Sequence, residues 1–583
     1  HVYSGIKEKK NYHNSIAAFL ISYFTNYNRG ELARQYELAG CYEDSYKILK
    51  EELNKAEKIS AYSFQKNILQ HLLTFPLSEV NNVNVNVEYC KVLTNLNDYQ
   101  ASLNHIDQII NIVNENAKNE LSILKAKCLI GLGELNEGKA LLESIILKFP
   151  ESPASNALLL DLANVNFNLN NYDKTIEICN KLAAAKDIDN ETLGSALQLL
   201  GLISIYKDDD LDSALQFFER ANNAYQSGGL LFRQAGILMN IGNIYSMRGE
   251  DEHALKYWNK SLYLNQSIGN IQQEAKLLIN FGIYYFNSLQ FDKSTEDYTK
   301  AYSIFNSLGI KDGQGLVETN LGEIFLLMCE YQKAFELLNE SIDIFRNIQN
   351  REEELQALFL LGKLYYTTGD FERLNQLLKE FEFKVQAEPA EAHKINYQYL
   401  LILSKTPGGN LNNILQSLTD LRTNFSADER KYDYFHCTMI IISIMIKLNI
   451  PDEAAVELRS EALVNLCSSN KFFEAERNYL FGVICEHNPL LGTKSSVDYY
   501  LTAHELIFDL HITELTWKIL YALFKVFSSR GNIDKSREYG KYSNSLIRYI
   551  ADNIKDRRLK SIYLDASERK AALKELNYFE EQF

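Results

Sequence analysis

Residues 238–245 read Leu-Met-Asn-Ile-Gly-Asn-Ile-Tyr, and residues 278–285, 40 positions later, read Leu-Ile-Asn-Phe-Gly-Ile-Tyr-Tyr. Thr-Asn-Leu-Gly-Glu-Ile-Phe at 319–325 continues the series, within a repetitive stretch that runs from 234 to 374. The glycines of the pattern are Gly242, Gly282, Gly322 and Gly362. A turn then leads to a second amphipathic segment, opened by Ala254, Ser294 or Ala334. A fixed period of this size indicates stacked helical hairpins, because one hairpin cannot bury its apolar face without a neighbour.

The small residue at the start of each second helix traces the array outward from this stretch. Further markers are Ser45, Ser102, Gly138, Thr175, Ala214, Ile414, Ala454, Ser496 and Ser536. We therefore predict an all-α fold, a right-handed α-solenoid of about 12–13 antiparallel helical hairpins.

The chain is expected to divide into four regions. Residues 1–60 form a helical junction and the first hairpin, 61–403 the N-terminal and central array, 404–545 a divergent C-terminal array, and 546–583 capping or linker helices. The Pro/Gly-containing stretch 404–410 is the strongest breaker and is expected to mark a bend between the two arrays. Residues 76–87 alternate Asn and Val, and we interpret them as a loop that enters a helix.

Composition narrows the class of protein. The 583 residues include only 7 prolines, and 46% are hydrophobic and 12% aromatic, which excludes a disordered chain. A net charge of −16 would repel a phosphate backbone, so we expect no direct binding of nucleic acid.

The cysteines indicate a reducing compartment, and we predict a cytoplasmic protein. They are scattered, without a Cys-x-x-Cys pair: Cys41, Cys90, Cys128, Cys179, Cys329, Cys437, Cys467 and Cys485. The most apolar run, 438–448, is far too short to span a membrane. The chain starts at His1 without a signal-peptide pattern or an initiator methionine, and we expect it to be part of a longer protein.

The glycine, the aromatic residue three positions later and the small residue of the second helix together resemble the tetratricopeptide repeat (TPR). The 40-residue period is similar to the longer variant that follows the ATPase core of STAND signalling ATPases and transcriptional regulators. Ile16-Ala17 and the pattern Leu32-Ala33-x-x-Tyr36-x-x-Ala39-Gly40 resemble the segment that joins that ATPase core to its repeats. The resemblance implies that an ATPase domain precedes His1.

Two motifs that suggest chemistry have structural interpretations. Gly133 to Lys139 resembles a phosphate-binding loop, but Ala140 stands where the Ser or Thr that holds magnesium is needed. Residues 208–212 are an acidic turn whose last aspartate is expected to cap the next helix, because the spaced ligands of a calcium loop are missing. We predict no metal, no cofactor and no catalytic residue, hence no enzyme activity in this region.

Asn240, Asn280 and Asn320 are the main candidates for partner binding, since residues one repeat apart on the first helices form a row along the concave face. The row resembles the asparagine ladder of peptide-binding TPR superhelices, in which amides grip a peptide backbone. Alternatively, each asparagine bonds an adjacent helix and is structural. Neighbouring positions expected on the same face are Asn243, Met247, Asn287, Glu323 and Lys363.

We therefore predict a protein-interaction or sensor module that binds a peptide or protein in its concave groove. Its acidic exterior favours a basic partner. The STAND resemblance implies a signalling role together with an upstream ATPase. A free-standing scaffold and the target-recognition part of an antiviral defence sensor remain as alternatives.

Overall fold

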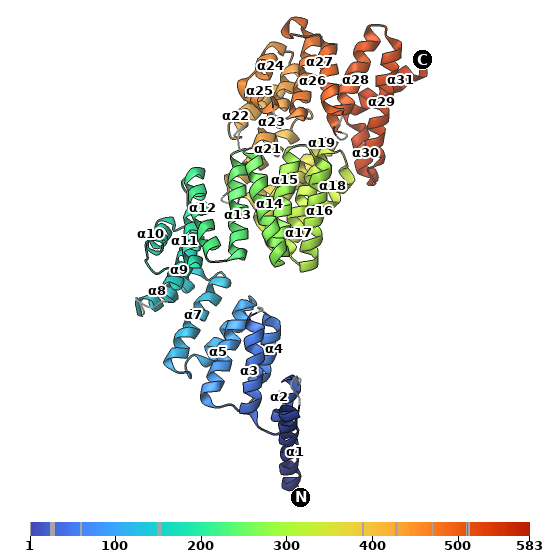
Figure 1. The fold of residues 1–583 in the computed structure, drawn as a ribbon. Coiled ribbons are helices and arrows are strands. Elements are labelled where there is room, and N and C mark those ends of the chain that lie inside the picture. Colours follow the sequence, from blue (N-terminus) through green and yellow to red (C-terminus); the bar gives the residue numbers. More distant parts are fainter. Residues whose placement is uncertain are drawn as a thin grey trace. The chain divides into compact units, whose positions relative to one another are not determined.

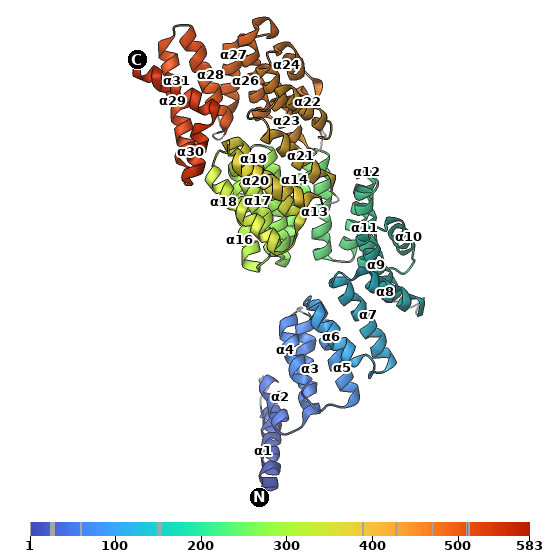
Figure 2. The ribbon, with the colours of Figure 1, turned by 180° about the vertical axis from the view of Figure 1, so that it is seen from behind.

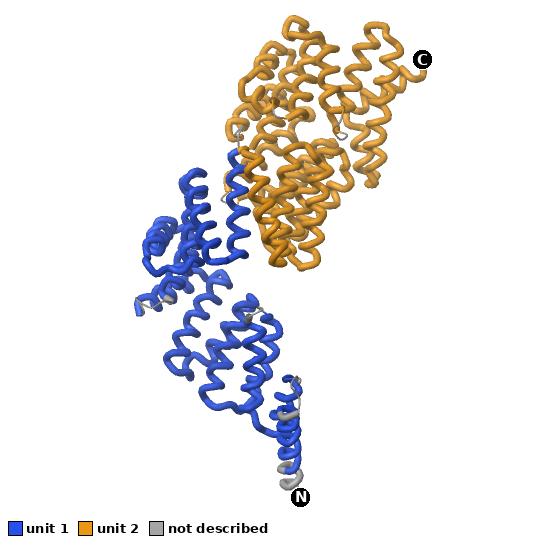
Figure 3. The backbone as a smooth tube through the Cα atoms, in the orientation of Figure 1, with its two compact units in different colours: residues 1–248 blue, residues 249–583 orange. Residues whose placement is uncertain are grey.

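The computed structural model describes residues 2–23, 29–58, 61–148, 154–386, 390–425, 430–468, 470–508, 510 and 513–582. These residues form an all-α solenoid with 31 α-helices, one short 3-10 helix and no strand (Figure 1). The chain divides into two compact units, residues 1–248 and 249–583 (Figure 3). The predicted all-α fold of helical hairpins is confirmed.

Unit 1 contains thirteen helices within its described residues. They are α1 (Val2–Tyr23), α2 (Arg29–Leu38), α3 (Tyr42–Lys58), α4 (Tyr62–Leu72), α5 (Glu79–Asn95), α6 (Tyr99–Ile109), α7 (Glu115–Gly131), α8 (Leu135–Lys148), α9 (Ala154–Asn168), α10 (Tyr172–Ala183), α11 (Asn190–Tyr206), α12 (Leu211–Ser227) and α13 (Leu231–Met247).

Unit 2 contains the remaining helices. They are α14 (Asp251–Ile268), α15 (Ile271–Asn287), α16 (Phe291–Leu308), α17 (Lys311–Leu327), α18 (Tyr331–Asn347), α19 (Arg351–Thr368), α20 (Phe371–Val385), α21 (Glu391–Ser404), α22 (Leu411–Arg422), α23 (Lys431–Lys447), α24 (Pro451–Leu458), α25 (Glu461–Ser468), α26 (Lys471–His487), η1 (Pro489–Leu491), α27 (Ser496–Ile507), α28 (Glu514–Ser529), α29 (Ile533–Asp552), α30 (Arg557–Asp565) and α31 (Ser567–Gln582).

Consecutive helices pack as hairpins, for example α11 with α12, α15 with α16 and α28 with α29. The first helix of one hairpin also contacts the first helix of the next, as α17 contacts α19 and α19 contacts α21. The first helices therefore form a common layer, which we call the inner layer. The turn between α13 and α14 coincides with the boundary between the two units.

The repeated glycine allows the two helices of a hairpin to approach closely. A Cβ atom added to Gly282 would lie 2.5 Å from the ring of Tyr298, which is 2% exposed. The small residue of the second helix completes this contact: the Ser294 hydroxyl donates to the Gly282 carbonyl at 2.7 Å. Equivalent bonds, each spanning 12 residues, join Ser102 to Cys90, Thr175 to Ala163 and Ser536 to Phe524.

The C-terminal helices of unit 2 pack back onto its central hairpins. α31 packs on α29, and α30 contacts α19; α30 lies beside α18 and α19 in both views (Figure 1, Figure 2). Gln332 at the start of α18 accepts hydrogen bonds from the backbone N–H groups of Lys555 and Asp556, each at 3.1 Å. Arg373 of α20 pairs with the Asp556 carboxylate at 3.2 Å.

Glu514, the first residue of α28, is at the centre of the contacts between the C-terminal helices and the central hairpins of unit 2. Its carboxylate accepts hydrogen bonds from Tyr331 at 2.7 Å, Tyr563 at 2.9 Å and Trp517 at 2.6 Å, and it pairs with Arg569 at 3.2 Å. Burial raises the pKa of Glu514, but Arg569 and these hydrogen bonds outweigh burial and leave the pKa below its usual value.

Arg569 carries the network from α31 to α19. It is 6% exposed, and its guanidinium also donates to the backbone carbonyls of Thr367 at 3.1 Å and Thr368 at 2.9 Å. Both members of this largely buried ion pair are thus paired and hydrogen-bonded, the condition under which burying charge is tolerated.

Two local expectations need correction. Residues 79–87 belong to α5, so only the short stretch 76–78 of the predicted loop is non-helical. The helix-capping aspartate of the acidic turn is Asp210, which accepts from the Ser213 N–H at 3.0 Å, rather than Asp212. Residues 405–410 form the turn between α21 and α22, which contact each other as a hairpin, and the bend expected there between the two arrays stays a prediction. A breaker can mark a hairpin turn as well as a bend between arrays, because both require the helix to stop.

The motif from Gly133 to Lys139, which resembles a phosphate-binding loop, forms a helix–helix turn and a close helix contact, as predicted. Gly133 has a φ of +87° in the turn after α7. A Cβ added to Gly138 in α8 would lie 2.7 Å from the Ile130 side chain.

The predicted boundaries at 60/61, 403/404 and 545/546 stay predictions. The boundary between the two compact units, at 248/249, lies inside the predicted 61–403 array. Among the described helices, none is both long and apolar enough to cross a bilayer.

The helix contact at Gly282 gives a first testable prediction. Gly282→Ala should lower the free energy of unfolding by about 1–3 kcal/mol, because the new methyl group overlaps the buried Tyr298 ring. Gly236→Ala is the matched control: no atom lies within 4 Å of its added Cβ, so the substitution should raise helix stability by up to about 1 kcal/mol. Urea unfolding followed by circular dichroism measures both changes. Equal effects at the two positions would contradict the proposed close contact.

The buried ion pair gives a second prediction. Arg569→Met should destabilise unit 2 by about 3–5 kcal/mol, because it leaves the Glu514 charge without its partner. Adding Glu514→Gln should recover part of that loss, since the unpaired charge is then removed. Lys570→Gln, at an exposed neighbour that pairs with Asp565, is the control and should change stability little. Additive losses in the double variant would show that the two residues act independently.

Candidate protein-binding site

The eight residues predicted to bind a partner share three positions of the first helices. Asn240, Asn280 and Asn320 are the tenth residues of α13, α15 and α17, and Asn243, Glu323 and Lys363 are the thirteenth residues of α13, α17 and α19. Met247 and Asn287 are the seventeenth residues of α13 and α15. Positions separated by three and four residues lie on one helix face, so the repeat register is as expected.

The structure divides these eight residues between the two units. Asn240, Asn243 and Met247 are in unit 1, where the two asparagines are half-buried and Met247 is exposed. The other five residues are in unit 2. There Asn280 and Asn320 are half-buried and Asn287 is exposed. The choice between ligand binding and structural use of the asparagines stays a prediction.

Glu323 and Lys363 face α23, a later first helix of the same unit. Lys363 lies 3.8 Å from the Asp433 carboxylate, and its ammonium group is 5.3 Å from the centre of the Phe359 ring. Burial raises the pKa of Glu323; Lys363 opposes this increase and Asp433 adds to it. Part of the predicted surface is therefore in contact with the N-terminal turns of α23.

Residues next to Asp433 extend this polar region along the inner layer. The Tyr399 hydroxyl and His436 Nδ1 share a hydrogen bond at 2.8 Å. Burial lowers the pKa of His436 to about 4, and the positive charges of Lys363 and Lys518 act in the same direction, against Asp433. His436 is therefore neutral at physiological pH. Lys518, which acts on His436, also lines a nearby cavity.

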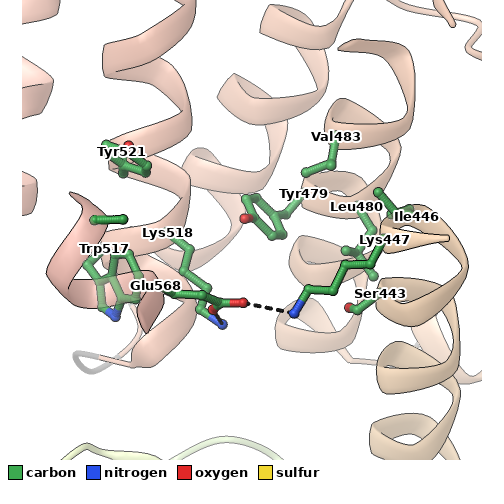
Figure 4. A pocket seen from close by; sticks show the side chains of 11 residues that line it. Ser443, Ile446, Lys447, Tyr479, Leu480, Val483, Trp517, Lys518, Tyr521 and Glu568 are labelled. Atoms are coloured by element: carbon green, nitrogen blue, oxygen red, sulfur yellow. Dashed lines mark hydrogen bonds and ion pairs between the residues drawn. The ribbon is translucent and has the colours of Figure 1, made fainter. Parts of the chain in front are cut away.

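A cavity of about 350 Å³ lies among α23, α26, α28 and α31 (Figure 4). We call it the inner pocket. Its lining is Ser443, Ile446, Lys447, Tyr479, Leu480, Val483, Trp517, Lys518, Tyr521, Glu568 and Ala571. Apolar walls with a few charged and hydroxyl groups are typical of a site that binds organic ligands or protein side chains.

Charge in the inner pocket is concentrated on two lysines and one glutamate. Lys447 lies 3.2 Å and Lys518 3.4 Å from the carboxylate of Glu568 (Figure 4). The positive charge of Lys518 is the main cause that lowers the pKa of Glu568 to about 2. Burial opposes this decrease, and Lys447 adds to it. Glu568 thus stays ionised at physiological pH and occupies the position where the two cations meet.

One further carboxyl group, that of Glu476, and one phenol, that of Tyr479, act electrostatically on Lys518. Burial raises the pKa of Glu476 to about 7, against the effect of Lys518. Burial likewise raises the pKa of Tyr479 to about 12. Near neutral pH, therefore, the ionisation of Glu476 is incomplete and the phenol of Tyr479 remains a hydrogen-bond donor.

The residues of the inner pocket were not among the sequence-based candidates. A signal was present, because Lys518 interrupts the apolar sequence Leu-Thr-Trp-Lys-Ile-Leu and Lys447 ends the apolar run of α23. A cation in such a helix needs a partner or a route to solvent. The partner, Glu568, comes from a helix outside the repeat pattern, so periodicity could not identify it.

Comparison with known families supports the repeat assignment for part of unit 2. Residues 314–373 match the family described as "Tetratricopeptide repeat". This segment covers nearly all of α17, all of α18 and α19, and the start of α20. The chain therefore carries TPR-type hairpins in the C-terminal part of the stretch that the 40-residue period defined. No curated protein matches the sequence.

Several solved structures resemble the chain at low identity. The Cut9–Hcn1 hetero-tetramer of the APC/C is 13% identical, covering 91% of this chain and 96% of that chain, with a TM-score of 0.45. A Rap protein complexed with Competence and Sporulation Factor is 12% identical, covering 67% and 99%, with a TM-score of 0.43. BtubC from P. vanneervenii is 18% identical, covering 37% and 91%, with a TM-score of 0.32. None of these likenesses bears on the function of this chain.

The raised pKa of Glu476 predicts a pH-dependent stability. A carboxyl group with a pKa near 7 in the folded state and 4.5 as its ordinary value favours folding most below 4.5, and this contribution is lost as the pH rises toward 7. Glu476→Gln should remove this loss, so the variant gains stability relative to the parent between pH 5 and about 8. Urea unfolding at several pH values measures it, with Glu461→Gln as an exposed control. A constant difference across this range would be incompatible with the raised pKa.

Proposed function

We propose that this chain is a protein-interaction module and that it binds a peptide or protein segment along the inner layer of unit 2. The observation that carries the proposal is the inner pocket, because it combines apolar walls with the ammonium groups of Lys447 and Lys518 on the first helices of two hairpins. Its volume of about 350 Å³ suits side chains of a bound segment.

The rest of the inner layer supports an extended partner. Asn280 and Asn320 lie one repeat apart on α15 and α17, and both residues are half-buried. An amide provides donors and an acceptor and can bond a peptide backbone without selecting its sequence. In this proposal the asparagines hold the backbone and the inner pocket selects side chains.

We further propose that the module belongs to a STAND-type signalling ATPase or regulator. The segment that resembles the junction with the ATPase core is built as a helix pair: α1 packs on α2, and Ala17, Leu32, Ala33 and Ala39 are buried. His13 and Gln35, one from each helix, share a hydrogen bond at 2.7 Å. A partner bound to the repeats would act through this junction on the ATPase.

Affinity capture with matched variants tests the binding function. The parent chain should retain a partner from lysate that both Asn280→Ala/Asn320→Ala and Ser443→Trp lose, the latter because its indole fills the inner pocket. Asn259→Ala, on the exposed face of α14, is the control and should retain the partner. All variants must melt like the parent. Retention of the same proteins by every variant would exclude the inner layer as the binding surface.

A further inference from the structure

We propose that the inner pocket binds an acidic side chain flanked by apolar residues in a partner protein, and that Glu568 holds the place of that side chain until the partner arrives. This proposal rests on the proposed binding function and specifies the chemistry of the partner segment.

The ion pairs define a site for a carboxylate. The ammonium groups of Lys447 and Lys518 come from two different helices, α23 and α28, and both lie within 3.4 Å of the Glu568 oxygens. Glu514 and Glu476 also act on Lys518, but Glu514 is already paired with Arg569. A carboxylate that replaced Glu568 would therefore meet two ammonium groups at once.

Glu568 is well suited to be replaced. Its side chain is 56% exposed and that of Lys447 is 59% exposed. The Lys447–Glu568 contact is therefore a surface ion pair, which contributes little to the stability of the fold. The neighbouring Arg569 anchors α31 separately, through Glu514 and the carbonyls of Thr367 and Thr368. The Glu568 side chain can thus rotate into solvent while α31 stays in place.

Free volume beside this carboxylate site requires an apolar neighbour. α31 contributes only the methyl group of Ala571 to the lining next to Glu568, and about 350 Å³ remains open against Ile446, Leu480 and Val483. A partner with a leucine or an aromatic residue beside its acid would fill space that α31 leaves empty, and burial of that side chain would favour its binding over Glu568.

The charge inside the inner pocket favours a different kind of partner from the one that the net charge of the chain favours. The exterior favours basic proteins, since the whole chain carries −16. With Glu568 displaced, the pocket itself presents two lysines. An acidic segment is consequently selected at this site, and the negative exterior restricts binding to partners whose acidic residues are few and local.

Calorimetric titration of the full chain with the peptide Ac-Ala-Leu-Glu-Leu-Leu-Ala-NH2 tests the proposal, because its glutamate is the only carboxylate. Glu568→Gln should bind this peptide about tenfold more tightly than the parent, since the internal competitor loses its charge. Adding Lys447→Gln should reverse the gain by about tenfold. Lys570→Gln, an exposed control on α31, should leave affinity unchanged.

Several outcomes would overturn the proposal. These are equal binding of the analogue with Gln in place of Glu, no gain on Glu568→Gln, or no loss on Lys447→Gln in chains that melt like the parent. Binding of 4-phenylbutyrate without binding of the peptide would assign the pocket to a free organic acid. If lysate capture still identifies a partner that depends on the inner layer, only the acidic specificity fails and the binding function stands.

Discussion

A helical hairpin has two faces to cover, and the neighbouring hairpin covers only one of them. This requirement governs the whole chain, because an array of hairpins must end somewhere and its last apolar face must meet something. In unit 2 the face of α28 and α29 meets α31, whose Ala572 and Leu576 are buried. The polar anchor of that helix is Arg569, and its contacts with Glu514 and α19 tie the end of the array to its centre.

The charged groups at this end of unit 2 form two different arrangements, one structural and one that we propose to bind a partner. The Glu514 carboxylate accepts four hydrogen bonds, from Tyr331, Tyr563, Trp517 and Arg569, so this ion pair serves the structure. The Lys447–Glu568–Lys518 group is different, because one carboxylate serves two exposed or half-exposed ammonium groups beside open volume. The same helix, α31, thus contributes a structural ion pair through Arg569 and, in our proposal, an exchangeable one through Glu568.

Sequence periodicity predicted the fold because each repeat constrains local packing. Gly282, Ser294 and Tyr298 lie at fixed offsets and meet at one contact, so a repeated pattern is enough to identify that contact. The asparagine register could be predicted for the same reason. The inner pocket could not, because Glu568 lies outside the repeats and reaches Lys447 across 121 residues. The helical state of residues 79–87 was also missed, since their alternating Asn and Val match a strand period while their packing is helical.

The return of α30 and α31 onto α18 and α19 changes how unit 2 can be made. Hairpin arrays usually fold from local contacts, and each added repeat can dock as it is synthesised. Here Tyr331 bonds a residue 183 positions later, and Gln332 one 224 positions later. The hydroxyl of Tyr331 can therefore form its hydrogen bond with Glu514 only after 183 further residues have been translated. Unit 2 completes its core only after synthesis has passed Arg569, which makes its assembly a late and concerted event.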